Sequence, residues 1–178
     1  MILRKQHLIN SRLLRHQFWT LMEESFPENE IRMYEDFISK LKHDNFAVVI
    51  LSTQSTKVEG FITFWQLQTF HFVEHFAIAP HLRGKGIGSA LLSTYIKENN
   101  RPVVLEVEPP TTAISIKRIK FYERLGFTLT NFAYQQPAYR DNSEPVDLLL
   151  MSNQPEFINN KDKFREVKAE IHQTVYKS

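Results

Sequence analysis

The stretch Arg83-Gly84-Lys85-Gly86-Ile87-Gly88-Ser89 holds three of the chain's five glycines within five positions. Glycine is costly to order, so such a run needs a physical reason at the point where a helix is predicted to begin. Without Cβ atoms, successive backbone N–H groups can converge on one cluster of oxygens, and the N-terminal end of a helix adds a positive dipole. Arg83 and Lys85 supply full charges, and Ser89 supplies one more hydrogen-bond donor. The stretch therefore predicts a pyrophosphate-binding turn.

Two common phosphate motifs do not match the spacing of this stretch. A Walker P-loop needs Ser or Thr after its Gly-Lys pair, whereas Lys85 is followed by Gly86. A Rossmann fingerprint needs a third glycine three positions after the second, and that position is Ser89 or Leu91, depending on where the count begins. The alternative that stays open is an ordinary glycine-rich turn between a strand and a helix.

The first half of the chain is predicted to begin with a short strand over residues 2–5, followed by helices over 11–26 and 28–42. The first helix is expected to bury Leu13, Leu14, Phe18, Leu21 and Met22. The hydrophobic period then changes to that of strands at 46–51 and 58–67, a predicted hairpin, and at 70–80, where Pro80 ends the strand.

In the second half, predicted helices alternate with strands. A helix opens at the glycine-rich turn and runs to about Glu98, and a second helix over 115–127 ends at Gly126 as its C-cap. Strands are predicted at 102–108, 127–136 and 146–152, and a terminal helix at 155–177. This order predicts a mixed sheet in an α/β layer fold with helices on both faces.

Composition narrows the class of protein. A chain of 178 residues with 42% apolar residues is expected to form one domain, or one domain with an appended element. The absence of cysteine excludes disulfides, a thiolate nucleophile and thiolate zinc sites, and it fits a reducing cytoplasm. No apolar run reaches the ~20 residues of a membrane span. A net charge of +2 gives no argument for nucleic acid, and the basic run at 117–124 is interpreted as a solvated helix face.

Other catalytic classes lack their residues. His71 and His75 would lie roughly 13 Å apart on one strand, too far to share one metal ion, so no metal is expected. The chain also has no Gly-x-Ser-x-Gly elbow of a serine hydrolase.

Two segments together resemble a known family. The stretch FVEHFAIAPHLRGKGIGSALL (72–92) is similar to motif A of the GNAT acetyltransferase superfamily, and RIKFYERLGF (118–127) to its motif B. With the strand order, the resemblance covers residues 1–152, and the 153–178 segment is expected to be a helical extension. Similarity at LEVEPP and YQQPAY extends to uncharacterised bacterial members.

The resemblance implies acetyl-CoA as co-substrate, in a V-shaped cleft between two parallel strands. The backbone of Phe76, Ala77 and Ile78 would pair with the pantetheine arm, and residues 83–89 (Arg83, Gly84, Lys85, Gly86, Ile87, Gly88 and Ser89) would hold the pyrophosphate. The family's motif B often carries Asn at the position of Ser115 and a small residue at that of Arg118. Ser115 is still expected to hydrogen-bond the cofactor arm, and bulky Arg118 to alter the helix approach or reach a phosphate.

The resemblance also implies that Tyr122 points at the thioester sulfur. A phenol is protonated at neutral pH and can donate its proton to a leaving thiolate. A main-chain N–H at Phe76 or Ala77 would hold the oxyanion. The other interpretation of Tyr122 is a core aromatic in the apolar stripe of its helix.

The candidates for the base are carboxylates on the two cleft strands. Alternation places Phe72, Glu74, Phe76 and Ile78 on one strand face, so desolvation between phenylalanines is expected to raise the pKa of Glu74. Glu106 and Glu108 alternate on the facing strand, where Glu108 lies at the predicted cleft mouth and is expected to orient the amine or take its proton. An ordinary solvated strand face and a water chain are the alternatives.

The acceptor is expected to be a primary amine of a small cationic molecule, such as a polyamine, an aminoglycoside or an amino-acid derivative. Tyr134, Gln136 and Tyr139 offer contacts beside the cleft. The predicted function is direct acetyl transfer in a ternary complex by a monomer or homodimer, with neither nucleic acid nor membrane as partner. A non-catalytic CoA-binding sensor or regulatory module is the alternative.

Overall fold

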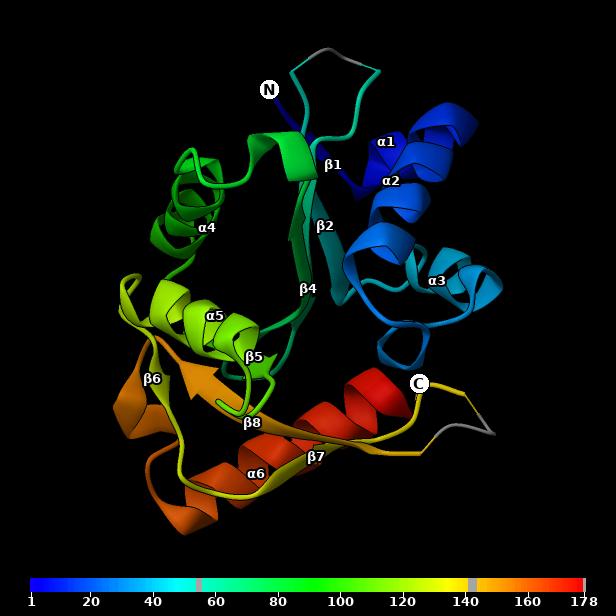
Figure 1. Cartoon of the computed structure of the whole chain (residues 1–178). Coiled ribbons are helices and arrows are strands. Elements are labelled where there is room, and N and C mark those ends of the chain that lie inside the picture. The colour runs from blue at the N-terminus through cyan, green and yellow to red at the C-terminus, as the bar shows by residue number, and fades with distance from the viewer. Residues whose placement is uncertain (54–55, 141–143, 178) are drawn as a thin grey trace.

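A computed structural model describes residues 1–53, 56–140 and 144–177 (Figure 1). The strands are β1 (Ile2–Arg4), β2 (Phe46–Leu51), β3 (Gly60–Gln66), β4 (His71–Ile78), β5 (Val103–Val107), β6 (Thr128–Leu129), β7 (Tyr134–Gln136) and β8 (Val146–Ser152). The helices are α1 (Lys5–Asn10), α2 (Arg12–Ser25), α3 (Tyr34–Lys40), α4 (Ile87–Glu98), α5 (Ala113–Glu123) and α6 (Lys161–Ile171), and α6 continues as a π-helical turn over His172–Tyr176.

The predicted mixed α/β sheet is confirmed. Its strand order is β1-β2-β3-β4-β5-β8-β6, and β7 also pairs with β8. Antiparallel pairing joins β1 through β4, whereas β4 and β5 are parallel. Only the segment from His71↔Val103 to Val73↔Leu105 pairs in that parallel ladder, although both strands continue beyond it. The two strands therefore separate at their carboxyl ends and open a cleft.

Two hydrophobic clusters cover the two faces of this sheet. One cluster joins the sheet to α1, α2, α3 and α6, and the other joins it to α4 and α5. Figure 1 shows α4 and α5 on one side of β4 and the three N-terminal helices on the other side. Among the described residues, no helix is long and apolar enough to cross a membrane.

Local features differ from the sequence-based predictions in several places, among them the helix predicted over 28–42, which is a 3₁₀ turn over Glu28–Glu30 followed by the shorter α3. Leu13 is 56% exposed because it lies on the outer side of α2, opposite the buried stripe. An additional helix, α1, follows the first strand directly. The strand predicted over 127–136 is two short strands, β6 and β7, which pair with successive parts of β8. The segment between them turns inward, and Phe132 contacts Phe164 of α6 at a ring separation of 5.0 Å.

Strand β4 contains a bulge that sequence alternation did not predict. The pairing with β3 shifts between Thr63↔His75 and Phe64↔Val73, so Glu74 is the extra residue. A bulge changes which residues share a face. Phe72 and Ala77 consequently belong to one hydrophobic cluster, while Val73 and Ile78 belong to the other. The expectation that Phe72, Glu74, Phe76 and Ile78 share one face is wrong, because Phe76 and Ile78 lie on the α4–α5 face, across the sheet from Phe72.

The C-terminal helix packs on its own chain. Phe164, Val167, Ile171 and Val175 are each at most 5% exposed and belong to the same cluster as the N-terminal helices. Figure 1 shows α6 running along β7 and β8, with its last turn close to the loop that precedes α3.

Candidate active site

The bulge in β4 presents main-chain groups to the cleft. The Glu74 side chain is only 2% exposed, yet the residue as a whole is partly exposed, so the exposed part is its backbone. Further along, Ala79 N–H donates to the Glu59 carbonyl at 2.9 Å on the β3 side. The Ile78 carbonyl instead accepts from Arg83 Nε at 2.8 Å. Backbone groups of this strand thus alternate between β3 and the cleft.

This alternation decides which of Phe76, Ala77 and Ile78, whose backbones were all predicted to face the cofactor, turn their polar groups to the cleft. Phe76 and Ile78 turn their polar groups toward the cleft, while Ala77 pairs with Phe61 of β3. Ala77 is therefore unsuited to hold an oxyanion. The Ile78 carbonyl already accepts a hydrogen bond from Arg83. The backbone N–H and carbonyl of Phe76 are therefore the cleft-facing main-chain groups nearest the bulge.

The glycine-rich turn has the backbone that the sequence analysis requires. Gly84 and Gly86 have φ values of +74° and +76°, a backbone conformation that residues other than glycine rarely adopt. A Cβ on either residue would meet nothing within 4 Å, so the requirement is conformational and the turn stands in open space. Gly86 is the N-cap of α4, a helix of 12 residues whose first N–H groups face outward there.

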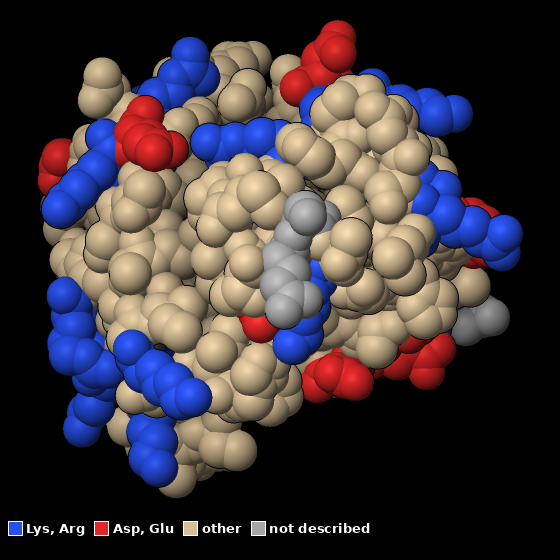
Figure 2. Space-filling model, turned by 90° about the horizontal axis from the view of Figure 1, so that it is seen from above, with Lys and Arg blue, Asp and Glu red and all other residues tan. Residues whose placement is uncertain are grey.

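A groove runs from this turn to α5. It is lined by Arg83, Gly84, Gly86, Gly88 and Ser89 at one end, and by Phe76, Ile78, Phe121, Tyr122 and Arg124 along its walls. Two predicted residues lie outside the lining: Lys85 is exposed between the two glycines, and Ile87 packs into the cluster beneath α4. Figure 2 shows Lys and Arg side chains gathered toward the left of the view, the side on which α4 and α5 lie in Figure 1.

Tyr122 lies where this groove meets a second pocket, and it lines both. Edge contacts to Phe121 and Phe127, with ring separations of 5.2 and 5.8 Å, fix its ring. Among the described residues, none hydrogen-bonds its hydroxyl. Burial raises the pKa of Tyr122 to about 12, against the opposing effect of Arg118, so the hydroxyl carries its proton at neutral pH.

Ser115 is not available for the predicted hydrogen bond to the cofactor arm. It is 1% exposed and lines neither cavity. Its Oγ accepts from the Thr112 N–H at 3.1 Å, while its own N–H donates to Thr112 Oγ1 at 3.0 Å. This reciprocal pair is the capping box that begins α5. The structure therefore corrects the expected cofactor contact of Ser115 to a helix-capping role.

Glu74 is held in a buried ion pair. Arg32 Nη2 lies 2.9 Å from Oε1, and the Arg32 side chain is 6% exposed. Trp65 Nε1 and the Tyr139 hydroxyl also donate to this carboxylate, at 3.0 and 2.8 Å. Burial alone would raise the pKa of Glu74, but the Arg32 charge and these hydrogen bonds lower it overall. The expectation of a raised pKa is wrong, and we do not assign Glu74 as the base.

Glu106, on the facing strand, has no cationic partner among the described residues. Tyr134 donates a hydrogen bond to its Oε1, and the Tyr176 hydroxyl lies 2.8 Å from its Oε2. Burial raises the pKa of Glu106 to about 7, although both tyrosine hydrogen bonds act in the opposite direction. This carboxylate is therefore the one whose proton affinity suits a base near neutral pH.

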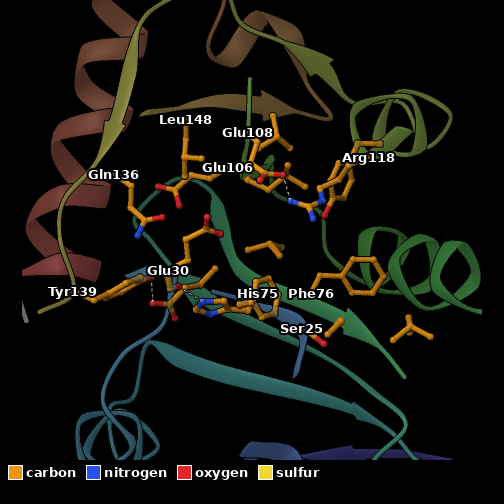
Figure 3. Close-up of a pocket in the computed structure, with 18 of the residues that line it drawn as sticks. Ser25, Glu30, His75, Phe76, Glu106, Glu108, Arg118, Gln136, Tyr139 and Leu148 are labelled. Carbon is orange, nitrogen blue, oxygen red and sulfur yellow. Dashed lines mark hydrogen bonds and ion pairs between the residues drawn. The ribbon is translucent and has the colours of Figure 1, made fainter. Parts of the chain in front are cut away.

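The second pocket brings four carboxylates together (Figure 3). Besides Glu74 and Glu106, it is lined by Glu30 and Glu108. Glu108 lies at the mouth, in an ion pair of 2.5 Å with Arg118, and both side chains are about two-fifths exposed. Glu30 has no ion pair among the described residues, and burial together with the Glu108 charge raises its pKa.

Glu30 reaches the pocket from the turn between α2 and α3. His75 Nε2 donates to the Glu30 carbonyl at 2.9 Å and so anchors this turn to β4. His71 lies on the opposite face, 3.0 Å from the Tyr95 hydroxyl of α4, so the two histidines do not converge. Among the described residues, no group of three potential metal ligands was found.

Several residues of this pocket were not predicted from the sequence. They are Glu30, which lines the pocket, and Arg32 and Tyr176, which hold the lining carboxylates Glu74 and Glu106 from behind; the fold brings all three to β4 and β5 from distant parts of the chain. No local signal identifies them, because each lies more than 40 positions away from its strand partner. Of the three residues predicted beside the cleft, Gln136 and Tyr139 line the pocket, and Tyr134 contacts it through Glu106.

Comparisons with known proteins show the family and the fold of the chain. The model of the acetyltransferase (GNAT) domain matches residues 43–129. A GNAT-family protein from Bacteroides thetaiotaomicron is 33% identical, with a TM-score of 0.81, and the match covers 92% of this chain and 93% of that one. The ribosomal-protein-S18-alanine N-acetyltransferase of Escherichia coli shares the fold at 20% identity, with a TM-score of 0.53 over 85% of this chain and 92% of that chain.

A shorter match joins the chain to YjbC of Bacillus subtilis (strain 168), which is classed as an acetyltransferase. It is 34% identical over 68 residues, 37% of this chain and 35% of YjbC, so the chain spans about a third of that relative's length. The chain belongs to the GNAT acetyltransferase family. Its enzyme class is that of the acetyl-CoA-dependent N-acetyltransferases.

Proposed function

We propose that the protein transfers the acetyl group of acetyl-CoA to a primary amine of a small cationic molecule, by direct attack in a ternary complex. The observation that carries the proposal is the meeting of two cavities at Tyr122 and Phe76. One cavity leads to the glycine-rich turn, and the other is lined by carboxylates. A thioester reaching from the first would face an amine held in the second.

The residues of the groove fit coenzyme A. The open backbone at Gly84 and Gly86, the N-terminal end of α4 and Ser89 would hold the pyrophosphate. Arg83 and Lys85 add positive charge at the same turn. The cleft-facing backbone of Phe76 would pair with the pantetheine arm, since the Ile78 carbonyl already accepts from Arg83. Arg118 and Arg124 on α5 face the groove and would attract its phosphates.

The bound ammonium nitrogen must lose two protons on its way to the amide, and the thiolate must gain one. Glu106 would accept the first proton, which leaves a neutral nitrogen to attack the thioester carbonyl. The C–N bond forms and gives a tetrahedral oxyanion, which the main-chain N–H of Phe76 would stabilise. As the C–S bond breaks, Tyr122 would donate its proton to the departing sulfur and recover one from the attacking nitrogen.

Unpaired charge in the pocket supports a cationic acceptor. Arg32 compensates Glu74, and Arg118 compensates Glu108. Glu30 and Glu106 have no such partner among the described residues, so the pocket favours an ammonium ligand. Glu108 at the mouth would orient the arriving amine. We further propose a metal-independent, cytoplasmic enzyme that acts as a monomer or homodimer.

The test is a panel of monoamines, diamines, aminoglycosides and amino-acid amides with acetyl-CoA, monitored by release of free thiol. Tyr122→Phe is the matched variant, because it keeps the ring packing and removes only the hydroxyl. We expect kcat to fall by about 10²-fold or more, while calorimetry shows unchanged affinity for CoA. Unchanged turnover would refute the role of Tyr122. CoA binding without thiol release from any amine would favour the non-catalytic module.

A further inference from the structure

The C-terminal turn, residues 172–176, reaches the walls of the acceptor pocket. It continues α6 as a π-helical turn, a form that occurs often at functional sites. Val175 is completely buried, whereas the Tyr176 side chain extends toward β5. In Figure 3 this helix passes beside Gln136 and Tyr139 of the pocket.

Tyr176 contacts the carboxylate that the mechanism uses as its base. Its hydroxyl lies 2.8 Å from Glu106 Oε2 and 3.0 Å from Oε1, across 70 positions of sequence. Tyr134 of β7 donates to Oε1 from another direction. With two phenols directed at it, the carboxylate is fixed in orientation, and its charged form is stabilised by two hydrogen bonds.

The same turn also supports the neighbouring ion pair. The Val175 carbonyl accepts a hydrogen bond from Arg32, whose guanidinium pairs with Glu74. The Tyr176 ring packs against Tyr139 at a ring separation of 4.9 Å, and Tyr139 donates to Glu74. One turn of helix therefore contacts both carboxylate systems of the pocket.

Several elements packed around Glu106 contribute titratable or charged groups, whereas β8 faces it with Leu150. Glu74 of β4, with Arg32 behind it, and Glu30 of the turn before α3 carry the nearby charges. Tyr134 of β7 and Tyr176 supply the two hydroxyls, and Tyr139 and His172 complete the surroundings of Tyr176. The negative charges favour the protonated form of Glu106, and the two hydroxyls are the groups that oppose this.

We propose that Tyr176 is a positioning residue for acetyl transfer: its hydroxyl holds the Glu106 carboxylate toward the acceptor pocket, so the C-terminal turn is part of the active site. The inference rests on the proposed function, in which Glu106 takes the proton of the amine. It gives a role in the active site to the end of the segment that the sequence analysis expects to be a helical extension. Tyr176 acts through Glu106 and touches no reacting atom.

Tyr176→Phe tests this, because it keeps the ring contact with Tyr139 and removes only the hydroxyl. Losing a hydrogen bond to the charged form raises the pKa of Glu106, so the acid limb of the kcat/KM profile moves to higher pH by about one unit. We expect kcat/KM to fall about tenfold near pH 6.5 and to approach the wild-type value near pH 9. The ionisation of the amine is common to both enzymes and cancels from the comparison. The affinity for CoA is unchanged.

Tyr95→Phe is the matched control. It also removes a buried hydroxyl, the one 3.0 Å from His71 Nδ1, but Tyr95 lines neither cavity. Its profile is expected to keep the wild-type acid limb. A loss in Tyr176→Phe that is equal at all pH values, or an equal shift in Tyr95→Phe, would overturn the proposal.

A measurement without turnover separates this inference from the proposed function. NMR titration of the ¹³C-labelled glutamate carboxyl groups reports Glu106 directly, with Glu106→Gln as the assignment control. A higher pKa of Glu106 in Tyr176→Phe supports the positioning role even if no amine in the panel is acetylated. An unchanged pKa refutes it even if the wild-type enzyme is active.

Discussion

Glu74 and Glu106 stand on neighbouring strands of one cleft, and their environments drive their pKa values in opposite directions. Both side chains are buried, and both receive hydrogen bonds from tyrosine hydroxyls. Glu74 also has Arg32 at 2.9 Å, and its pKa lies below the ordinary value. Within the part of the chain that the structure describes, Glu106 has no cationic partner, and burial raises its pKa to about 7.

The comparison shows that burial alone does not make a base. Desolvation is the largest influence on both carboxylates and raises both pKa values. The buried guanidinium reverses the outcome at Glu74 and makes it a permanent anion that holds Arg32, Tyr139 and Trp65 together. The two tyrosines around Glu106 donate hydrogen bonds but carry no positive charge. The pKa of Glu106 therefore stays at about 7, and the carboxylate can take up and release a proton near neutral pH.

The largest expected effect comes from Glu106→Gln. Without the base, kcat/KM at neutral pH should fall by about 10² to 10⁴-fold, while the affinity for acetyl-CoA is retained. The loss should shrink at high pH, where the amine arrives uncharged. Steady-state kinetics from pH 6 to 10 measure this, with circular dichroism to confirm the fold. A loss below threefold at pH 7 would mean that water or another group takes the proton.

The stability of Glu106→Gln gives an independent check. A carboxyl whose folded pKa is raised contributes stability that is complete below its unfolded pKa of about 4.5 and is lost as pH rises through about 7. Between pH 4.5 and 8, the free energy of unfolding of the variant should therefore rise relative to that of the wild type by up to about 3 kcal/mol. Urea unfolding at several pH values measures the difference. A difference that does not change with pH would contradict the raised pKa.

Arg32→Met is the next largest change, because it gives Glu74 the cation-free environment of Glu106. Removing one partner of a buried ion pair typically costs about 3–5 kcal/mol. In the wild type the folded pKa of Glu74 is lowered, so its contribution is present above pH 4.5 and is lost as pH falls through the folded pKa. In the variant the folded pKa is raised, so stability is lost as pH rises. The free energy of unfolding of Arg32→Met, measured with urea, should therefore fall further below that of the wild type as the pH rises from 4 to 8.

The double variant Arg32→Met with Glu74→Gln is the control for this comparison. The Gln amide oxygen can accept from Trp65 Nε1 and its NH2 group can donate to the Tyr139 hydroxyl oxygen, so no buried charge is left alone. It should therefore be more stable than Arg32→Met at pH 8 and should lose the pH dependence. If the single variant is as stable as the double at pH 8, the ion pair does not explain the low pKa of Glu74.

The cofactor half of the site was readable from the sequence, because it is built from consecutive residues. The glycine spacing predicts the turn at Gly84 and Gly86, and both have the positive φ that only glycine adopts readily. The helix bearing Tyr122 follows from hydrophobic periodicity, whereas the parallel pair of β4 and β5 was implied by the family resemblance. Local patterns suffice when one segment forms the whole feature.

The acceptor half depends on contacts that periodicity does not encode. Strict alternation places Glu74 and Phe76 on one face, but the bulge at Glu74 breaks that alternation and turns the carboxylate to the side of Arg32. Ser115 was expected to contact the cofactor, but its side chain and backbone are hydrogen-bonded to Thr112 in the capping box that begins α5. Arg32 and Tyr176 come from opposite ends of the chain, so only the tertiary fold brings them to these two carboxylates.

A smaller effect is expected from Glu30→Gln, which removes the second pocket carboxylate that has no ion pair with any residue in the described ranges. If Glu30 binds a second ammonium group, KM for a diamine should rise about tenfold, the equivalent of 1.4 kcal/mol, while KM for a monoamine of equal length changes little. Glu28→Gln is the matched control, because Glu28 lies in the same turn, is exposed and pairs with Arg140 outside the pocket. Equal effects on both amines would mean that Glu30 does not discriminate between them.

The smallest effect is expected at the cleft mouth, from Glu108→Gln. The ion pair of Glu108 with Arg118 is partly exposed on both sides, and such pairs typically contribute less than about 1 kcal/mol. Its loss releases Arg118 toward the two cavities that it lines. KM for the amine should rise a few-fold in low salt, because one attracting charge is lost and one repelling charge is freed, and the difference should disappear in high salt. Since kcat depends on Glu106 and Tyr122 in the ternary complex, it should stay within about twofold of the wild type. A fall in kcat as large as that of Glu106→Gln would indicate that Glu108, and not Glu106, acts as the base.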